Sequence, residues 1–124
     1  MIRIIFTLAT IIAFAFILVT LASDLSSPSP TPDYVGVVDY VIDGDTIIVD
    51  SIHIRLLDID TPELPTPEGV VARSFMIDLV YDSEVSLYCD GYDKYDRWLC
   101  IIELDGVNVS DTLLKADLAR VWVD

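Results

Sequence analysis

Three short segments of this 124-residue sequence hold most of the side chains that could do chemistry: residues 43–46, 55–63 and 93–97. Asp45 and Asp60 supply carboxylates, and a backbone carbonyl in the loop after Asp60 could supply a third oxygen ligand. Hard divalent cations prefer oxygen ligands, and Ca²⁺ accepts them in flexible geometries. The spacing therefore predicts a Ca²⁺ site assembled from two segments.

The same segments contain the other groups that phosphodiester hydrolysis requires. Glu63, which follows Pro62, could polarise a water molecule. Arg55 and Arg97 could grip a phosphate bidentately and stabilise the charge that develops during its displacement. Together with a bound cation, these side chains predict metal-assisted hydrolysis of a phosphodiester bond.

Each segment also has a purely structural interpretation. Residues 43–45, Asp-Gly-Asp, are typical of a hairpin turn, and the two arginines could simply pair with neighbouring aspartates. In a regular strand, Arg55 and Asp60 would face opposite sides, because side chains alternate with period two. The two can share a site only if the chain bends or bulges between them.

The charge balance excludes a broad basic surface. The chain has 7 Lys and Arg against 21 Asp and Glu, a net charge of −14, so its mean field repels phosphate. Any nucleic-acid chemistry must therefore be focused by a few local cations. Three explanations of the acidity remain open: a surface suited to high salt, general solubility, or a preference for cationic partners.

The first third of the chain is expected to lie outside the folded domain. Residues 4–23 form an uncharged apolar run long enough to cross a bilayer as a helix. Residues 1–23 therefore predict either a membrane anchor or a cleaved signal peptide, followed by a Ser/Pro-rich linker over 24–33. With Arg3 before the run, both alternatives place residues 34–124 outside the cytoplasm, membrane-anchored or secreted.

The pattern of residues 34–124 predicts a small α+β, mainly β, domain, which we expect to be a monomer. Period-two alternation bounded by turn residues indicates strands over 36–42, 46–50, 52–57, 84–89 and 98–104. Helical spacing indicates helices over 68–81 and from an N-cap at Ser110 to Leu118. Five strands and two packed helices predict a five-stranded OB-fold barrel, preceded by the N-terminal hydrophobic helix.

The two cysteines lie on strands that flank one predicted hairpin. Cys89 and Cys100 would be directly opposed if the hairpin is centred between Lys94 and Tyr95. Opposed strand positions are within the range that a disulfide spans. A disulfide that pins the hairpin and a pair of buried thiols both remain open.

Four motifs together resemble the staphylococcal nuclease (thermonuclease-like, SNase-like) family. In the order and approximate spacing of that family the sequence contains VIDGDTIIV at 41–49, IRLLDIDTPE at 54–63, DKYDR at 93–97 and DLARV at 117–121. The resemblance covers about residues 36–122. It implies an OB-fold barrel and Ca²⁺-dependent cleavage of single-stranded DNA or RNA that leaves 3′-phosphates.

The resemblance also implies roles for the residues around the cation. Asp45 and Asp60 look like its carboxylate ligands, and Thr61 looks like the backbone-carbonyl ligand. Glu63 resembles the residue that activates or positions the attacking water.

Four further residues match positions that contact the substrate. Arg55 and Arg97 resemble the pair that clamps the scissile phosphate. Lys94 and Tyr95 match positions that contact the substrate's terminal phosphate and sugar. The resemblance therefore implies a substrate site built from the predicted third strand and the 90–97 hairpin.

One position departs from the family pattern, and the role of another stays open. Asp96 stands where the family usually has Gly, and its carboxylate could pair with Arg97 and weaken the grip on phosphate. Trp122 could either pack in the core or offer a stacking platform for a base. Besides the nuclease, two alternatives remain open: a catalytically weak or inactive module that binds nucleic acid or another partner, and a Ca²⁺-stabilised structural domain.

Overall fold

The computed structural model describes residues 29–123, and Pro32–Asp124 form one compact unit. The predicted anchor or signal segment over residues 1–23, its hydrophobic helix, and linker residues 24–28 lie outside the described residues. Among residues 29–123, no helix is long and apolar enough to cross a membrane.

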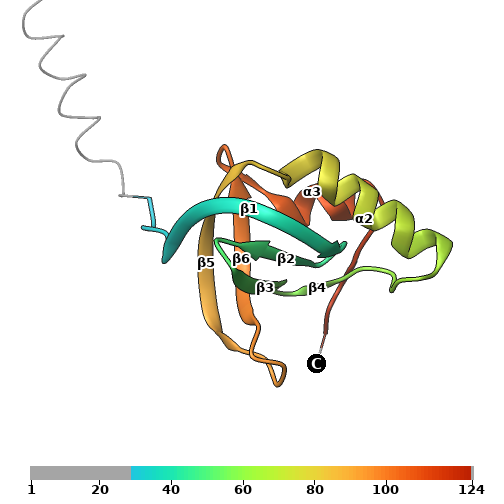
Figure 1. Ribbon diagram of the computed structural model, residues 1–124, viewed down its shortest axis with the longest axis horizontal. Coiled ribbons are helices and arrows are strands. Elements are labelled where there is room, and N and C mark those ends of the chain that lie inside the picture. The colour runs from blue at the N-terminus through green and yellow to red at the C-terminus, as the bar shows by residue number, and fades with distance from the viewer. Residues whose placement is uncertain (1–28, 124) are drawn as a thin grey trace, which may run out of the picture. The chain divides into compact units, whose positions relative to one another are not determined.

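Five strands close a mixed barrel with two helices, which confirms the expected OB-type architecture (Figure 1). The sheet order is β3-β2-β1-β5-β6-β7, and a parallel pairing of β3 with β6 closes the barrel. Buried Val, Ile and Leu side chains from the strands and both helices fill its interior. The strands are β1 (Tyr34–Asp43), β2 (Thr46–Val49), β3 (Ile52–Leu56), β4 (Ile59–Asp60), β5 (Glu84–Tyr92), β6 (Trp98–Leu104), β7 (Val107–Asn108) and β8 (Arg120–Val121).

The chain bends sharply between β3 and β4. Strand β3 ends at Leu56, and Asp58 adopts a positive φ of 67° before β4 begins at Ile59. Asp and Asn are the side-chain-bearing residues that enter this left-handed region most readily. The bend is the one that the sequence required if Arg55 and Asp60 were to share a site.

The loop before the first described helix is fixed on that helix's N-terminus. Helix α2 (Pro67–Val80) begins after Thr66, whose hydroxyl accepts the Gly69 N–H at 3.1 Å and donates to the carbonyl of Glu63. A Cβ on Gly69 would overlap that same carbonyl oxygen, so only glycine allows this approach. The backbone of Glu63 is thus held against α2, close to the predicted 68–81 helix boundary.

The second helix begins earlier than the sequence indicated. Helix α3 runs over Val109–Lys115, and its N-cap is Asn108, whose side chain accepts the N–H groups of Ser110 and Asp111. The prediction of Ser110 as N-cap is wrong: it lies inside the helix and is buried. Asn108 is the better cap because its carboxamide oxygen reaches two free N–H groups at once.

After α3 the chain returns to the barrel and pairs with β4. Strand β8 aligns Ile59 with Val121 and Asp60 with Arg120, and the N–H of Trp122 donates to the Asp58 carbonyl at 2.8 Å. Both strands are only two residues long, so this pairing carries no periodic signal in the sequence. The pairing nevertheless places Arg120 directly opposite Asp60.

Strands β5 and β6 form a long hairpin whose tip projects away from both helices (Figure 1). Cys89 and Cys100 are register partners, and a disulfide joins them across Cα atoms 4.0 Å apart. At the tip, the Asp93 N–H donates to the Arg97 carbonyl, and Asp96 adopts a positive φ of 61°. The tip therefore closes through residues of the DKYDR motif.

Part of the acidity of the chain occurs at turns. Among residues 29–123, seven non-glycine residues have positive φ, and six of them are aspartates: Asp50, Asp58, Asp82, Asp96, Asp105 and Asp117. Glycine is the usual residue in this conformation, and aspartate tolerates it better than most. These aspartates satisfy a local backbone requirement while also adding negative charge.

Candidate functional site

One guanidinium joins the two carboxylates that the sequence assigned to a cation. The Nη2 atom of Arg55 lies 3.3 Å from Oδ2 of Asp45 and 3.4 Å from Oδ1 of Asp60. All three side chains are shielded, with exposed fractions of 16% for Arg55, 10% for Asp45 and 24% for Asp60. The β1–β2 turn, β3 and β4 therefore converge on a single point at the barrel surface.

Arg55 is held tightly in this position. Its Nη1 donates to the carbonyl oxygens of Leu56 at 2.6 Å and Ile59 at 2.8 Å, on the two sides of the β3–β4 bend. Because Nη2 contacts the two carboxylates, Nε is the donor of Arg55 that has no partner among the described residues. The arginine thus stabilises the bend and orients both carboxylates.

Asp45 also receives backbone and hydroxyl hydrogen bonds. Its Oδ2 accepts the Thr61 N–H at 3.0 Å, and its Oδ1 accepts the Thr46 hydroxyl at 3.3 Å. A Cβ on Gly44 would meet the Thr61 hydroxyl at 2.7 Å, so glycine permits the close approach of the turn to the loop. These contacts bring Asp45, Asp60 and Thr61 together.

The residues present fit a hard divalent cation. Burial, followed by hydrogen bonding and charge repulsion from Asp45, raises the pKa of the Asp43 carboxyl to about 6, so negative charge is crowded here. The buried Oγ1 of Thr61 also has no hydrogen-bond partner. Within residues 29–123, no three His, Cys, Asp or Glu side chains gather as a complete ligand set, so carbonyl and water oxygens would have to complete one.

Arg97 adjoins this cluster through a threonine. Its Nη1 donates to the Thr46 hydroxyl at 3.2 Å, and that hydroxyl donates to Asp45. Its Nε donates to Asp93 at 2.7 Å. Partial burial acts to raise the pKa of Asp93, but N–H groups of Arg97 and Tyr95 and the Arg97 guanidinium outweigh it and lower that pKa.

The concern that Asp96 neutralises Arg97 is wrong. The ion pair of Arg97 is made with Asp93, whereas Asp96 is exposed at the hairpin tip. Asp93 is better placed because its carboxylate also accepts the backbone N–H groups of Tyr95 and Arg97, at 2.8 and 3.1 Å. The guanidinium therefore keeps one fixed carboxylate partner and an Nη2 without a partner among the described residues.

A cavity of about 630 Å³ lies beside the two arginines. Lys94 Nζ and Arg97 Cζ lie 5.1 and 5.3 Å from the ring centroid of Tyr95, which is exposed. Trp122 is 54% exposed and lines the cavity, so it is not a core residue. The polar and aromatic lining residues are Arg55, Asp58, Asp93, Lys94, Tyr95, Arg97 and Trp122.

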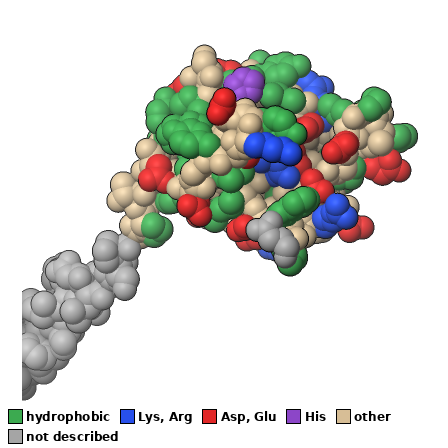
Figure 2. Space-filling model, turned by 90° about the horizontal axis from the view of Figure 1, so that it is seen from below, with side chains coloured by type: hydrophobic (Ala, Val, Ile, Leu, Met, Phe, Trp, Pro, Cys, Tyr) green, Lys and Arg blue, Asp and Glu red, His purple; other side chains and the backbone are tan. Residues whose placement is uncertain are grey.

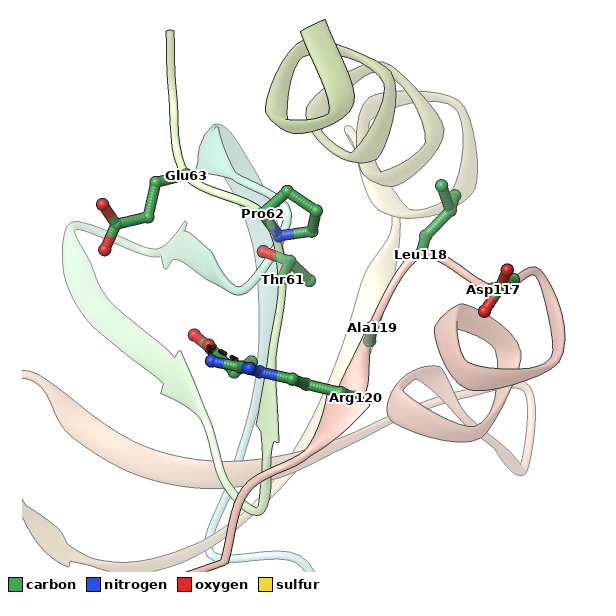
Figure 3. Close-up of a pocket in the computed structure, with 8 residues that line it drawn as sticks. Thr61, Pro62, Glu63, Asp117, Leu118, Ala119 and Arg120 are labelled. Atoms are coloured by element: carbon green, nitrogen blue, oxygen red, sulfur yellow. Dashed lines mark hydrogen bonds and ion pairs between the residues drawn. The ribbon is translucent and has the colours of Figure 1, made fainter. Parts of the chain in front are cut away.

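A second cavity, of about 410 Å³, lies next to Asp60 and Thr61 (Figure 3). Glu63 lines this cavity, and its exposed carboxylate has no partner among the described residues. In the view of Figure 3 the Glu63 carboxylate and the Arg120 guanidinium extend to the same side, away from Asp117. Glu63 is thus near the carboxylate cluster but not bonded to it.

The cations of this acidic domain are concentrated around the two cavities. Of the six Lys and Arg residues after residue 33, four line them, namely Arg55, Lys94, Arg97 and Arg120. On the face shown in Figure 2, Lys and Arg side chains gather near the middle with Asp and Glu around them. Because the net negative charge of the chain repels phosphate, a phosphate-binding site needs such a local concentration of cations.

Sequence reasoning missed two residues of the site. Arg120 contacts Oδ2 of Asp60 through Nη2 at 3.1 Å and Nε at 3.4 Å. Thr46 bridges Asp45 and Arg97. Both lie inside motifs that the sequence displays, but only the β4–β8 pairing and the barrel closure bring them to the site.

Comparison with known proteins gives a consistent result. A family model described as "Staphylococcal nuclease homologue" matches residues 53–123, which is more than half of the chain. Endonuclease YncB of Bacillus subtilis is 38% identical over 97 residues, which cover 68% of this chain and 46% of that protein. A micrococcal nuclease of Shigella flexneri is 38% identical over 74 residues, which cover 56% of this chain and 42% of that protein.

A protein of Escherichia coli O157:H7 named an uncharacterized endonuclease is 35% identical over 102 residues, covering 78% of this chain and 67% of that protein. Several other relatives are longer, and the chain spans about half or less of their length. The matched segment includes the bend, the hairpin tip and β8, which carry Arg55, Asp60, Arg97 and Arg120 of the cluster, whereas Asp45 lies before it. The chain therefore belongs to the staphylococcal nuclease family.

Proposed function

We propose that this protein is a Ca²⁺-dependent nuclease that hydrolyses phosphodiester bonds of single-stranded DNA or RNA outside the cytoplasm. The observation that carries the proposal is the convergence of Asp45, Arg55 and Asp60, linked through Thr46 to Arg97. Carboxylates for a cation and guanidiniums for a phosphate are thereby placed side by side. The nuclease names of its relatives support the same reaction class.

Asp45, Asp60 and the Thr61 carbonyl would hold the Ca²⁺ ion. When bound, the cation would supply positive charge next to a phosphate oxygen and would relieve the crowding of carboxylates. Arg55 already brings the two carboxylates to one point, and the Thr61 N–H fixes Asp45. The chain thus needs little rearrangement of this loop to present its oxygens.

The two arginines would bind the scissile phosphate. Arg55 can donate from Nε and Arg97 from Nη2, while their other donors keep the guanidiniums in place. Fixed donors are most effective where charge develops in the transition state. Arg97→Ala should therefore lower kcat by about 10²–10³-fold.

Glu63 would accept the proton of the attacking water. The water oxygen forms a bond to phosphorus, the bond to the 5′ oxygen breaks, and the products carry a 3′-phosphate and a 5′-hydroxyl. The leaving oxygen receives a proton from solvent. Glu63 is suited to this role because its carboxylate is exposed, has no ion-pair partner among the described residues and borders the carboxylate cluster.

Lys94, Tyr95 and Trp122 would bind the nucleotide next to the scissile bond. Lys94 supplies a cation for a second phosphate, and the exposed rings of Tyr95 and Trp122 offer faces for a sugar or base. Single strands fit this cavity because their bases are free to stack on side chains. The substrate preference for single strands rests on this lining.

The location outside the cytoplasm rests on the sequence of residues 1–23, and both a membrane anchor and a signal peptide agree with it. Fractionation of cells that express the full chain tests this part separately. Recovery of the domain in the membrane or the medium, and sensitivity of the anchored form to external protease, are the expected results. Recovery in the cytoplasm would contradict the proposed location and leave the chemistry untouched.

The proposed reaction is tested by incubating the full chain with single-stranded and duplex oligonucleotides, in Ca²⁺ and in chelator. Ca²⁺-dependent cleavage of single strands, with products that polymerase extends only after phosphatase treatment, is expected. Cleavage that continues in chelator would contradict the metal requirement. Binding without cleavage by the folded chain would instead support an inactive binding module.

A further inference from the structure

Asp60 is the carboxylate on which two different arginines meet. Its Oδ1 faces Nη2 of Arg55 at 3.4 Å, and its Oδ2 faces Nη2 of Arg120 at 3.1 Å and Nε at 3.4 Å. Each oxygen of this side chain therefore already has a guanidinium partner. A cation that used Asp60 would have to share or displace one of them.

The two arginines differ in how firmly they are held. The side chain of Arg55 is 16% exposed and is also bonded to the carbonyls of Leu56 and Ile59. The side chain of Arg120 is 78% exposed, and Asp60 is its only ion-pair or hydrogen-bond partner among the described residues. Moving Arg120 into solvent costs little, because exposed ion pairs are weak.

The backbone keeps Arg120 beside Asp60 even when the side chains separate. Asp60 and Arg120 are register partners in the β4–β8 pair, and the Trp122 N–H anchors the same pair on Asp58. The guanidinium is thus tethered within reach of Oδ2. Arg120 also lines the cavity that Glu63 and Asp117 line, and among the described residues it is the single cation there (Figure 3).

We propose that Arg120 competes with the divalent cation for Oδ2 of Asp60 and so sets the Ca²⁺ affinity of the site. In the absence of Ca²⁺ its guanidinium neutralises Asp60, and on Ca²⁺ binding it turns into solvent while Arg55 stays in place. This inference rests on the proposed Ca²⁺ site. It makes Arg120 a positioning residue, since it acts through Asp60.

Calorimetric titration of the full chain with CaCl₂ tests this role directly. Removing a competing charge from an exposed pair should tighten Ca²⁺ binding by about three- to tenfold in Arg120→Gln. Arg120→Lys keeps the charge but loses the two-nitrogen contact, and should lie between Arg120→Gln and the wild type. Lys115→Gln, which removes the same charge from α3 outside both cavities, should change the affinity less than about twofold.

Salt provides a second readout, because the Arg120 side chain of the pair is 78% exposed. In 1 M NaCl the Debye length falls to about 3 Å, so the affinities of wild type and Arg120→Gln should approach each other. Circular dichroism melts of each variant establish that the domain remains folded. Equal or weaker Ca²⁺ binding by folded Arg120→Gln at low salt would overturn the competition.

Failure of the Ca²⁺ site itself gives a different result. The single variant Asp60→Asn, which keeps Arg120, should lose the heat that CaCl₂ binding releases or absorbs in the wild type. If that heat is unchanged in Asp60→Asn, the proposed site is wrong, and if neither wild type nor Arg120→Gln binds Ca²⁺, both proposals fall. If the wild type binds through Asp60 but Arg120→Gln gains nothing, only the role of Arg120 is contradicted.

Discussion

Arg55 Nη2 lies 3.4 Å from Asp60 Oδ1, although the two residues are five positions apart and would face opposite sides of a regular strand. The contact exists because β3 ends at Leu56 and Asp58 turns the chain with a positive φ. Arg55 then bonds the carbonyls on both sides of the bend. The bend is therefore the local feature that creates the site.

Asp96→Gly should stabilise the domain and strengthen substrate binding. Asp96 has a φ of 61°, which glycine adopts without strain, so a gain of about 0.5 kcal/mol in the free energy of unfolding is expected. Removing a negative charge next to Arg97 should also lower KM for an oligonucleotide about two- to threefold at low salt. Urea denaturation and steady-state kinetics measure the two effects.

Asp105→Gly is the matched control for this variant. Asp105 also has a positive φ, of 50°, but lies in the β6–β7 turn and lines neither of the two cavities. Asp105→Gly should gain a similar free energy of unfolding, and its KM for the oligonucleotide should equal that of the wild type. Equal KM changes in both variants would show that overall charge, and not the position of Asp96, sets substrate binding.

Loss of the Cys89–Cys100 disulfide should weaken the hairpin that carries Arg97. The bridge closes a loop with a sequence separation of 11, and loops of this size contribute roughly 2–3 kcal/mol. Urea denaturation of Cys89→Ala/Cys100→Ala should give a lower midpoint than that of the oxidised wild type. Reductant should lower the wild-type midpoint toward that of the double variant, which reductant itself should not affect.

A wild-type midpoint that does not respond to reductant, under conditions in which mass spectrometry shows free thiols, would contradict a stabilising bridge. The same samples report on function. Because the hairpin carries Arg97 as well as the substrate contacts Lys94 and Tyr95, reduction should lower kcat and raise KM. Unchanged kinetics would show that β6 holds Arg97 without the covalent link.

Asp93→Asn should destabilise the domain in a pH-dependent way. The pKa of Asp93 is lowered in the folded state, so its ionised form stabilises the fold above the unfolded pKa of about 3.8. This contribution is lost as the pH falls through the lower folded pKa. The variant should therefore cost about 1–2 kcal/mol at pH 7, and this cost should shrink progressively as the pH falls from 3.8 through the lowered folded pKa.

Asp90→Asn serves as the control, because Asp90 is exposed and its side chain has no hydrogen-bond or ion-pair partner among the described residues. Its free energy of unfolding should match that of the wild type across the same pH range. A pH-independent loss in Asp93→Asn would mean that the carboxamide fails for steric reasons. The ionised carboxylate would then not be what closes the hairpin tip.

The barrel was predictable because its strands are periodic and its turns carry strong signals. Alternation located strands β1, β2, β3, β5 and β6, and the apolar spacing over residues 68–81 located α2, which begins one residue earlier, at Pro67. The sequence also indicated that Arg55 and Asp60 could share a site only if the chain bends between them. Patterns among neighbouring residues in the sequence were sufficient to predict each of these features.

The unpredicted features depend on contacts distant in sequence. Arg120 reaches Asp60 through a strand pair of two residues each, too short for a period, and Thr46 meets Arg97 across 51 positions. Trp122 is a residue type expected in the core, yet it follows β8, lines the cavity and is 54% exposed. Such placements follow from barrel closure, which composition does not encode.

Turnover by Glu63→Gln decides whether the Glu63 carboxylate activates the attacking water. The comparison uses full-chain wild type, Glu63→Gln and Glu68→Gln, with a labelled single-stranded oligonucleotide in Ca²⁺. Glu68 is a matched control because it is exposed in the first turn of α2 and lines neither cavity. Glu63→Gln should lose about 10²–10⁴-fold in kcat while it still binds the oligonucleotide, and Glu68→Gln should retain wild-type turnover. Retained turnover in folded Glu63→Gln would contradict the account.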